Sequence, residues 1–293
     1  MSAATQPATR LHDMLPCITA ALSFSVTDIL LKVVYADGMD VLTLVSLRGM
    51  LVVAFFWSWL RIAPPTAWLP PRERLIALGL GLLFAGTMFG LLMAVSLLPV
   101  SIAILAYFIY PLLTGIGGAI TGVDRLGWRA LLTAAVAFAG LSLMLGTHVE
   151  ALSWLGIGCA FAAAAARVVS LLATRAYLSG TDARVTTWYA MVPSTILFIG
   201  MALIAGAWHP PQTSIGWLAF AGVSIGSTLS TLLIYVSTNR VGPFRTALAM
   251  NLEPLVTVLL SVALLGETLT PLQAVGAAVM LTALCLFQFA RRR

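Results

Sequence analysis

The sequence contains few charged residues for its length. Only 9% of its 293 residues are Asp, Glu, Lys or Arg, whereas 60% are hydrophobic. An ordinary soluble domain carries about 25% charged residues, so we do not expect a soluble enzyme or a disordered chain. The hydrophobic residues must face something other than water. The composition therefore predicts an integral membrane protein.

Cysteine and histidine are also scarce, with three of each. The cysteines all fall within apolar runs, which predicts buried thiols: Cys17, Cys159 and Cys285. The histidines fall in tails or loops: His12, His148 and His209. Neither a paired-cysteine metal motif nor a nucleophile or zinc motif of a known enzyme class is present. We therefore predict no catalytic residue, no metal site and no cofactor.

Long apolar runs without alternation, such as 75–97 and 244–265, favour membrane helices over membrane strands. Turn-forming residues separate these runs, at Asp37-Gly38 and Pro210-Pro211 among other places. The sequence predicts an all-α polytopic membrane protein with ten transmembrane helices. Their expected ranges are 15–35, 41–60, 75–97, 100–121, 126–146, 154–178, 186–206, 215–236, 244–265 and 272–290.

The distribution of basic residues predicts the orientation. Thirteen of the sixteen Lys and Arg residues fall in the tails and in alternate connections, and none falls in the other connections. The positive-inside rule then places both termini in the cytoplasm. The thirteen are Arg10, Arg61, Arg72, Arg74, Arg125, Arg129, Arg175, Arg184, Arg240, Arg245 and Arg291 to Arg293. The net charge of +6 is explained by this topology, so no nucleic-acid partner is expected.

The chain aligns with itself when shifted by 143 residues. Pro111 then falls on Pro254, and Asp124 falls on Glu267. This predicts two repeats, 15–146 and 154–290, with cytoplasmic tails at 1–14 and 291–293. Each repeat has five spans, an odd number, so the second is expected to be inverted relative to the first. Inverted repeats are typical of alternating-access transporters, which bind substrate near the middle of the membrane.

The chain resembles the drug/metabolite transporter superfamily, specifically its EamA-type ten-helix members. The resemblance rests on the doubled five-helix unit and on the segments 251–255 and 265–269, which are similar to the family pattern LEP…LGE.L. It implies transport of a small organic molecule. The family's substrates include amino acids, nucleobases, vitamins, cofactors and drugs. The pair Asp28 and Lys32 replaces an uncharged stretch found in many members, so the direction of transport stays open.

Five ionisable residues lie within the apolar runs: Asp28, Lys32, Arg48, Arg167 and Glu253. Each costs roughly 2.5–3.5 kcal/mol at the centre of a membrane helix, so each needs a partner or a wet cavity. Asp28 and Arg48 lie at similar depths on adjacent helices and are expected to face each other. Their pairing could be structural, or both could line a central cavity. The excess of positive charge there would favour a carboxylate or phosphate on the substrate.

Glu253 and Asp28 are the predicted coupling residues. A carboxyl group held away from water at mid-membrane favours its neutral form, which suits loading and release of a proton. Pro111 and Pro254 are the predicted hinges, and Pro254 should leave a backbone carbonyl near 250 free for water or substrate. Tyr107, by its depth, is a candidate cavity wall.

Tyr110 and Asn251 complete the predicted cavity, which would suit a flat organic substrate. Structural alternatives stay open for several of these residues. Lys32 could extend to the membrane interface, Arg167 could cap the carbonyls of a neighbouring helix, and Glu253 could serve folding alone.

The predicted function is secondary transport of a small organic metabolite across the cytoplasmic membrane of a bacterium. The sequence has no ATP-binding element, so proton coupling or exchange would supply the energy. A channel or facilitator is the alternative, and an intramembrane enzyme a more remote one. The expected partners are a small-molecule substrate and the lipid bilayer. Runs of GxxxG spacing at 86–90 and 222–226 predict close helix packing, in a monomer or a homodimer.

Overall fold

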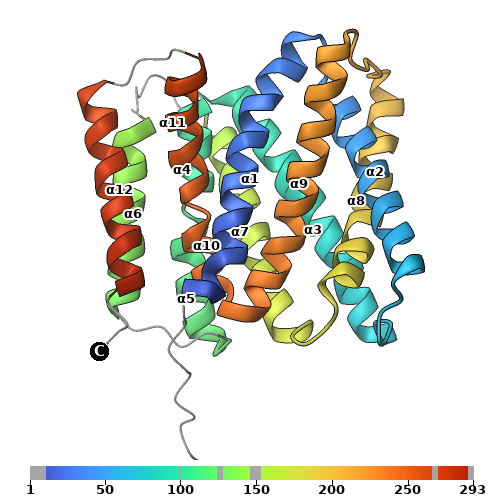
Figure 1. Ribbon diagram of the computed structural model, residues 1–293. Coiled ribbons are helices and arrows are strands. Elements are labelled where there is room, and N and C mark those ends of the chain that lie inside the picture. The colour runs from blue at the N-terminus through green and yellow to red at the C-terminus, as the bar shows by residue number, and fades with distance from the viewer. Residues whose placement is uncertain (1–10, 99, 124–127, 146–152, 266–269, 290–293) are drawn as a thin grey trace, which may run out of the picture.

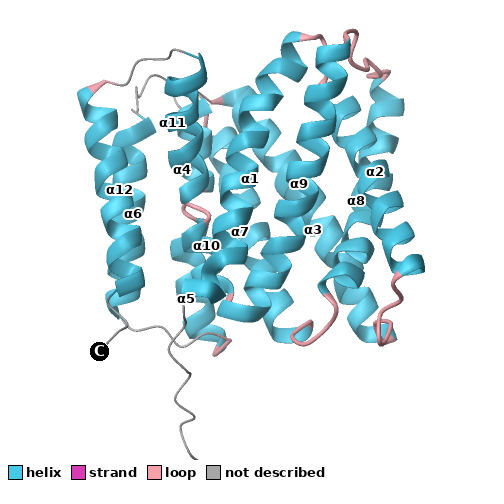
Figure 2. Cartoon of the chain, in the orientation of Figure 1, coloured by secondary structure: helices cyan, strands magenta, loops and turns pink. Residues whose placement is uncertain are grey.

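The computed structural model describes residues 11–98, 100–123, 128–145, 153–265 and 270–289. Within these ranges the regular structure is entirely helical (Figures 1 and 2). The helices are α1 (Leu11–Ala36), α2 (Val41–Ile62), α3 (Pro71–Leu97), α4 (Val100–Tyr107), α5 (Tyr110–Thr121), α6 (Trp128–Leu145), α7 (Trp154–Tyr177), α8 (Ala183–Ala205), α9 (Ser214–Val241), α10 (Pro243–Ala249), α11 (Leu252–Leu265) and α12 (Pro271–Phe289).

Several helix starts are fixed by short polar side chains that the sequence places at the turns. Asp40 accepts a hydrogen bond from the Thr43 amide at the start of α2. Ser153, Asp182 and Thr213 cap α7, α8 and α9 in the same way. Each cap satisfies an amide that the first helical turn leaves without an intrahelical partner. The loop chemistry therefore sets where these helices begin.

The predicted membrane architecture is confirmed. Nine segments of the described chain are long and apolar enough to cross a membrane, and a shorter apolar helix covers 271–284. Two predicted helices differ from expectation, because each is interrupted near its middle. The span predicted at 100–121 is divided into α4 and α5, and the span predicted at 244–265 into α10 and α11. Both interruptions lie just before the hinge prolines, which cannot donate a backbone hydrogen bond.

The two halves of the chain have the same order of helices at a constant offset. Adding 143 to the bounds of α1 to α6 gives the bounds of α7 to α12 to within two residues. The contacts between halves follow the same relation, because α1 packs on α9 and α3 packs on α7. The equivalent pairs α2–α8 and α6–α12 also pack directly. The interruptions in the two halves are therefore equivalent features.

Small residues allow the halves to approach closely. A Cβ atom at Gly226 of α9 would lie 2.6 Å from Thr27 Oγ1 of α1, and one at Gly90 of α3 would lie 3.0 Å from the Cys159 carbonyl of α7. The two GxxxG runs thus contribute to packing between halves, as the sequence predicted. The α6–α12 pair meets through Gly140 and Gly276, whose Cβ atoms would each overlap the facing backbone.

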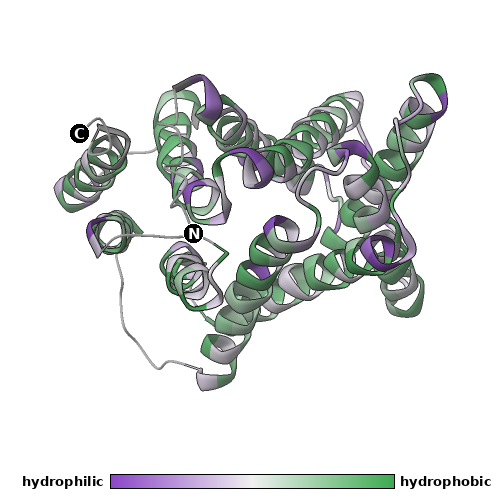
Figure 3. Ribbon diagram, turned by 90° about the horizontal axis from the view of Figure 1, so that it is seen from below, coloured by the Kyte–Doolittle hydropathy of each residue, from purple (hydrophilic) through white to green (hydrophobic). Residues whose placement is uncertain are grey.

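The helices run roughly along one direction, with the α6–α12 pair at one side of the bundle (Figure 1). Seen end on, most of the helical ribbon has the colour of hydrophobic residues (Figure 3). The beginning of α1 and the end of α12 lie at the same end of the bundle (Figure 1). Which end faces the cytoplasm stays a prediction.

Some predicted features lie outside the described residues. These include residues 1–10 of the predicted N-terminal tail, the predicted C-terminal tail 291–293 and the motif residues 266–269. Arg10, Arg125, Asp124, His148 and Glu150 also lie outside them. Of the three cysteines, Cys17 is fully buried and Cys159 is partly buried, and nothing is described for the Cys285 side chain.

Candidate functional site

The two predicted coupling acids lie close together between α1 and α11. Thr257 Oγ1 of α11 donates a hydrogen bond to Asp28 Oδ2 of α1 at 2.9 Å. Ser25 Oγ, one turn before Asp28, donates to the backbone carbonyl of Glu253 at 2.9 Å. Glu253 and Thr257 are four residues apart and so share a face of α11. The charges of Asp28 and Glu253 consequently interact across the boundary between the two halves.

The expectation that Asp28 faces Arg48 is wrong. No hydrogen bond or ion pair joins them in the described chain, and the carboxylate of Asp28 is bonded to Thr257 instead. The reason is the packing order: α1 packs on α9 and α11, whereas α2 packs on α8. The short loop between α1 and α2 brings their ends together without making the two helices neighbours along their lengths.

Arg167 lies on α7 beside the aromatic residues of the first interruption. Its guanidinium carbon is 6.0 Å from the ring centroid of Tyr110, and the rings of Tyr107 and Tyr110 are 5.3 Å apart. Its charge also interacts with Glu253. The Nε atom of Arg167 is buried without a hydrogen-bond partner.

Arg167 also borders an interior cavity of about 30 Å³. This volume accommodates one or two water-sized groups. The polar residues around it come from both halves: Thr87, Arg167, Ser170, Thr174, Thr231 and Tyr235. The two sequence-predicted charges Arg167 and Glu253 are thus brought into one electrostatic neighbourhood, next to a polar cavity.

Arg48 borders a second cavity, of about 20 Å³, between α2, α3, α8 and α9. Its polar lining consists of Arg48, Ser194, Thr195, Ser227 and Thr231. Thr231 and Phe84 line both cavities. The two cavities therefore lie next to each other along the boundary between the halves.

The remaining predicted residues lie at the two interruptions. Tyr110 is 2% exposed and Asn251 is 3% exposed. The Tyr110 hydroxyl donates to the Ala247 carbonyl at 3.5 Å, which links the interrupted helices of the two halves. The carbonyl of Met250 itself is not free, because it accepts a hydrogen bond from the Glu253 amide at 3.0 Å. Because the chain turns at this point, the Glu253 amide bonds the carbonyl to which Pro254, lacking an N–H, cannot donate.

Two other cations have interaction partners, Lys32 and Arg245. Arg245 is only 8% exposed and lies in α10, although the sequence placed it in a cytoplasmic connection. The interruption explains this difference, because the short helix α10 packs on α5, α7 and α9.

Sequence reasoning missed the hydroxyl residues that surround the charges. Thr257, Thr195, Ser227 and Thr231 all contact an ionisable residue or line a cavity beside one. A signal for two of them was available, because Ser227 and Thr231 have the four-residue spacing of one helix face. Single hydroxyls are common in membrane helices, so the spacing alone does not identify a site.

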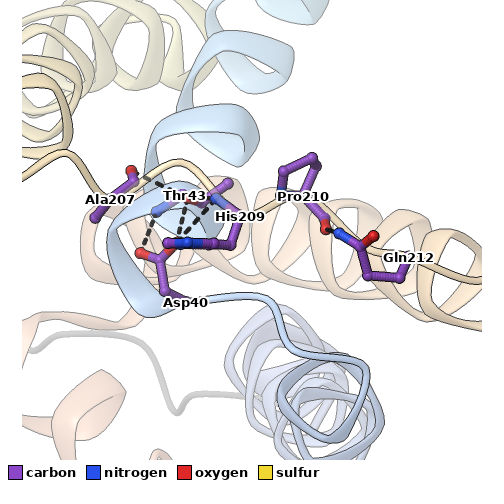
Figure 4. Close-up of polar contacts among 6 residues, drawn as sticks. All are labelled: Asp40, Thr43, Ala207, His209, Pro210 and Gln212. Atoms are coloured by element: carbon purple, nitrogen blue, oxygen red, sulfur yellow. Dashed lines mark hydrogen bonds and ion pairs between the residues drawn. The ribbon is translucent and has the colours of Figure 1, made fainter.

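At one end of the bundle, two loops are joined by carboxylates (Figure 4). Asp40 Oδ2 accepts from the His209 amide at 3.3 Å, and Thr43 Oγ1 donates to Ala207 O at 3.2 Å. Asp37 accepts from the amides of Gln212 and Thr213 at 2.6 and 3.0 Å and from Thr213 Oγ1 at 2.6 Å.

These bonds lower the pKa values of both acids. The Thr213 hydroxyl, its amide and that of Gln212 hold the pKa of Asp37 below its ordinary value. Burial raises the pKa of Asp40, but hydrogen bonds from Thr43 and His209 outweigh it, and the net shift is downward. Both carboxylates are therefore stabilised in the ionised form that holds the loops together.

Residues 154–289 match the model of the EamA-like transporter family. The match begins at the first residue of α7 and runs to the end of α12, so it covers the whole second half. No curated protein matches the sequence. A solved structure described only as "Crystal structure of protein" is similar over 97% of this chain and 99% of that chain, with a TM-score of 0.79 and 19% sequence identity. That structure shows the fold alone.

The family match covers the half that carries Arg167 and Glu253, and the solved structure extends the same fold over nearly the whole chain. The coarse function is that of a multi-pass membrane protein in a family that transports small molecules. The second half of the chain, residues 154–289, is thus similar to the EamA-like transporter family of the drug/metabolite transporter superfamily.

Proposed function

We propose that this protein is a secondary transporter that moves a small organic metabolite by alternating access. The substrate would carry an anionic or zwitterionic group. The observation that carries the proposal is the position of the intramembrane charges. Asp28, Glu253, Arg48 and Arg167 all lie at the boundary between the two halves, beside polar cavities or hydroxyl groups.

The two halves, 15–146 and 154–290, would rock against each other about this boundary. Their matching helix bounds and their reciprocal contacts support the division. The interruptions before Pro111 and Pro254 supply places where backbone angles could change. The two cavities beside Arg48 and Arg167 hold only water-sized groups, which fits a conformation whose substrate site is closed.

Asp28 and Glu253 would form the coupling site. Two carboxyl groups in low-dielectric surroundings repel each other when both are ionised, so one of them favours holding a proton. The site joins α1 of one half to α11 of the other, and a change in their relative position would alter that balance. The setting we propose is a bacterial cytoplasmic membrane, with both termini inside and the protein acting as a monomer or homodimer.

A two-step experiment tests the proposal. A thermal-shift screen of detergent-purified protein against a metabolite library first identifies a stabilising ligand. Transport of that ligand is then measured in proteoliposomes for the wild type and for Glu253→Gln. We expect the variant to lose accumulation driven by a proton gradient but to retain exchange of internal for external substrate.

The matched control is Glu73→Gln, which changes a partly buried acid in the first turn of α3, outside the candidate site. It should transport as the wild type does. Saturation and counterflow distinguish a carrier from a channel, because a channel shows neither. Normal gradient-driven accumulation in both Glu253→Gln and Asp28→Asn would contradict the coupling assignment.

A further inference from the structure

Arg48 differs from the other intramembrane cations in having no counter-charge. Arg167 interacts electrostatically with Glu253, and Lys32 and Arg245 have partners. In the described chain, Arg48 makes no hydrogen bond and no ion pair. Its charge interacts with the side chain of Tyr35, and the residue lines the 20 Å³ cavity. A cation inside a membrane bundle is stabilised only by a partner or by a polar cavity. Arg48 has the cavity and the neighbouring Tyr35, but no acidic partner.

The hydroxyl groups around Arg48 are not equivalent. Ser194, Ser227 and Thr231 already donate their protons to backbone carbonyls of their own helices, at 2.9, 2.6 and 2.8 Å. Thr195 does not, because its Oγ1 is buried without a hydrogen-bond partner and the residue is 6% exposed. A buried unpaired hydroxyl is unfavourable unless something else completes its bonding.

Thr195 lies against the backbone of the residue that follows Arg48. A Cβ atom at Gly49 would be 2.5 Å from Thr195 Oγ1 and 3.0 Å from Thr195 Cγ2. Because Gly49 has no side chain, the Thr195 side chain has room to pack against α2. The lining of one cavity thus includes two residues with uncommitted donors, Arg48 from the first half and Thr195 from the second.

We infer that the Arg48 cavity is an anion subsite that binds a single carboxylate group of the substrate. This inference rests on the proposed transport function and specifies its substrate class. A guanidinium presents a fork of N–H donors that matches the two oxygens of a carboxylate. One uncompensated positive charge neutralises one negative charge, which favours a monoanionic carboxylate over a dianionic phosphate. In this conformation the cavity, of about 20 Å³, has room for about one water-sized group.

The remaining lining fits the same assignment. Val45, Val52, Phe84 and Phe198 surround the polar residues with apolar side chains. They lower the local dielectric constant and so strengthen the bond between a guanidinium and a carboxylate. Because Arg48 and Thr195 belong to different halves, a bound carboxylate would connect the halves at this point.

The test measures binding of small probes to the purified full-length protein. Benzoate is compared with benzamide, its neutral isostere, and with inorganic phosphate, at constant ionic strength, by thermal shift and calorimetry. We expect benzoate to stabilise the wild type and benzamide not to do so. Arg48→Gln should weaken benzoate binding about tenfold or more, since hydrogen bonds to charged groups are the strong ones.

Arg61→Gln is the matched control, because it removes another arginine of α2, one that is exposed near the end of the helix, and should leave benzoate binding within about twofold. Arg167→Gln removes the other cavity arginine and tests whether the carboxylate binds there instead. Thr195→Val is the second variant, since it keeps the shape and the charge of the site and removes the free hydroxyl. It should weaken benzoate binding to a smaller extent, even if Arg48→Gln does not fold.

Three results would overturn the inference: loss of benzoate binding in Arg167→Gln but not in Arg48→Gln, equal binding of benzamide, or binding of phosphate without benzoate. The proposed transport function is tested separately by counterflow in proteoliposomes. Saturable counterflow of a neutral substrate, with no carboxylate binding, would refute the subsite and leave the transport function intact. Carboxylate binding without counterflow of any ligand would support the subsite and refute the transport function.

Discussion

The two ends of the bundle are joined by different chemistry, although the repeat makes their backbones equivalent. The aspartate end consists of loops 37–40 and 206–213, and the arginine end consists of loops 178–182 and 63–70 (Figure 1). At the aspartate end, Asp37 alone accepts three hydrogen bonds from the other half. At the arginine end, the hydrogen bond between halves in the described chain runs from Arg184 Nη1 to Ala63 O at 3.1 Å.

Ring contacts add to the arginine end. The guanidinium of Arg184 lies 5.2 Å from the centroid of the Trp59 ring, and that of Arg74 lies 5.7 Å from the Tyr189 ring. Such contacts tolerate sliding better than hydrogen bonds, whose strength depends on distance and angle. The repeat thus determines which loops pack together at each end, whereas the side chains determine how strongly those loops are bonded.

In the proposed alternating-access cycle, the two ends of the bundle would open in turn. The aspartate end is held by directional, charge-assisted bonds in this structure, so it is the end whose opening requires more bonds to break. The following changes test the difference between the ends, beginning with the largest expected effect.

Asp37→Ala should have the largest effect. It removes the acceptor for the amides of Gln212 and Thr213 and for the Thr213 hydroxyl. We expect hydrogen exchange to rise in the peptide covering 206–218 and the thermal midpoint to fall. Hydrogen-exchange mass spectrometry on purified protein measures both ends at once. Unchanged exchange in that peptide would show that Asp37 does not hold the loop.

Asp40→Ala should have the next largest effect. Asp40 caps α2 and accepts from His209 of the other half. Loss of a helix N-cap typically costs about 1 kcal/mol. We expect a lower thermal midpoint and faster exchange at the start of α2. Asp40→Ser, which can still cap the helix, should restore most of the midpoint but not the contact with His209.

Gly216→Ala should disturb the same end by a steric route. A Cβ atom at Gly216 would lie 2.5 Å from Cγ of Asp37, closer than nonbonded carbons approach. The aspartate side chain must move, and exchange in the 206–218 peptide should rise part of the way toward the Asp37→Ala value. Gly79→Ala is the control, because a Cβ atom there meets nothing within 4 Å. Equal behaviour of the two alanine variants would contradict this geometry.

Acidification should loosen the aspartate end selectively. The pKa values of Asp37 and Asp40 are lowered in the folded protein, so their stabilising contribution is present above the ordinary aspartate value of 3.8 and is lost as the pH falls through the lower folded values. The thermal midpoint of the wild type should therefore fall more steeply below about pH 4 than that of Asp37→Ala. Parallel curves would exclude Asp37 as a source of the acid sensitivity.

Arg184→Gln should have the smallest effect. It removes the ion pair with Asp182 at 2.6 Å and the bond to the Ala63 carbonyl at the arginine end. The two side chains are 22% and 23% exposed, and ion pairs at the protein surface contribute roughly 0.2–1 kcal/mol. The thermal midpoint should change little, and exchange in the 206–218 peptide should not change. A larger effect than that of Asp37→Ala would reverse the ranking of the two ends.

The sequence was sufficient to predict the membrane fold. Hydrophobic run length gives helices, and turn residues separate them, because both are local properties. The offset of 143 was also visible, chiefly through Pro111 and Pro254. The effect of these prolines was underestimated. The sequence predicted only a hinge at each proline, but each helix is fully interrupted just before it, as between α10 and α11.

The candidate site could be predicted only in part. Charged residues in apolar runs are conspicuous, so Asp28, Arg48, Arg167 and Glu253 were found. Their partners were not, and the expected pairing of Asp28 with Arg48 was wrong. Neighbouring helices in the sequence need not pack side by side, and hydroxyl residues such as Thr257 give no signal strong enough to stand out.

The sequence by itself determined that this chain spans a membrane as two related sets of helices and that a few charges lie inside it. These follow from hydrophobicity and residue spacing, which act locally along the chain. The tertiary structure alone decided that α1 packs on α9 and α2 on α8, and with that which charges meet. Helix packing depends on the shapes of surfaces far apart in the sequence. For this reason Asp28 and Glu253 lie near Thr257, whereas Arg48 lies beside a cavity and has no counter-charge.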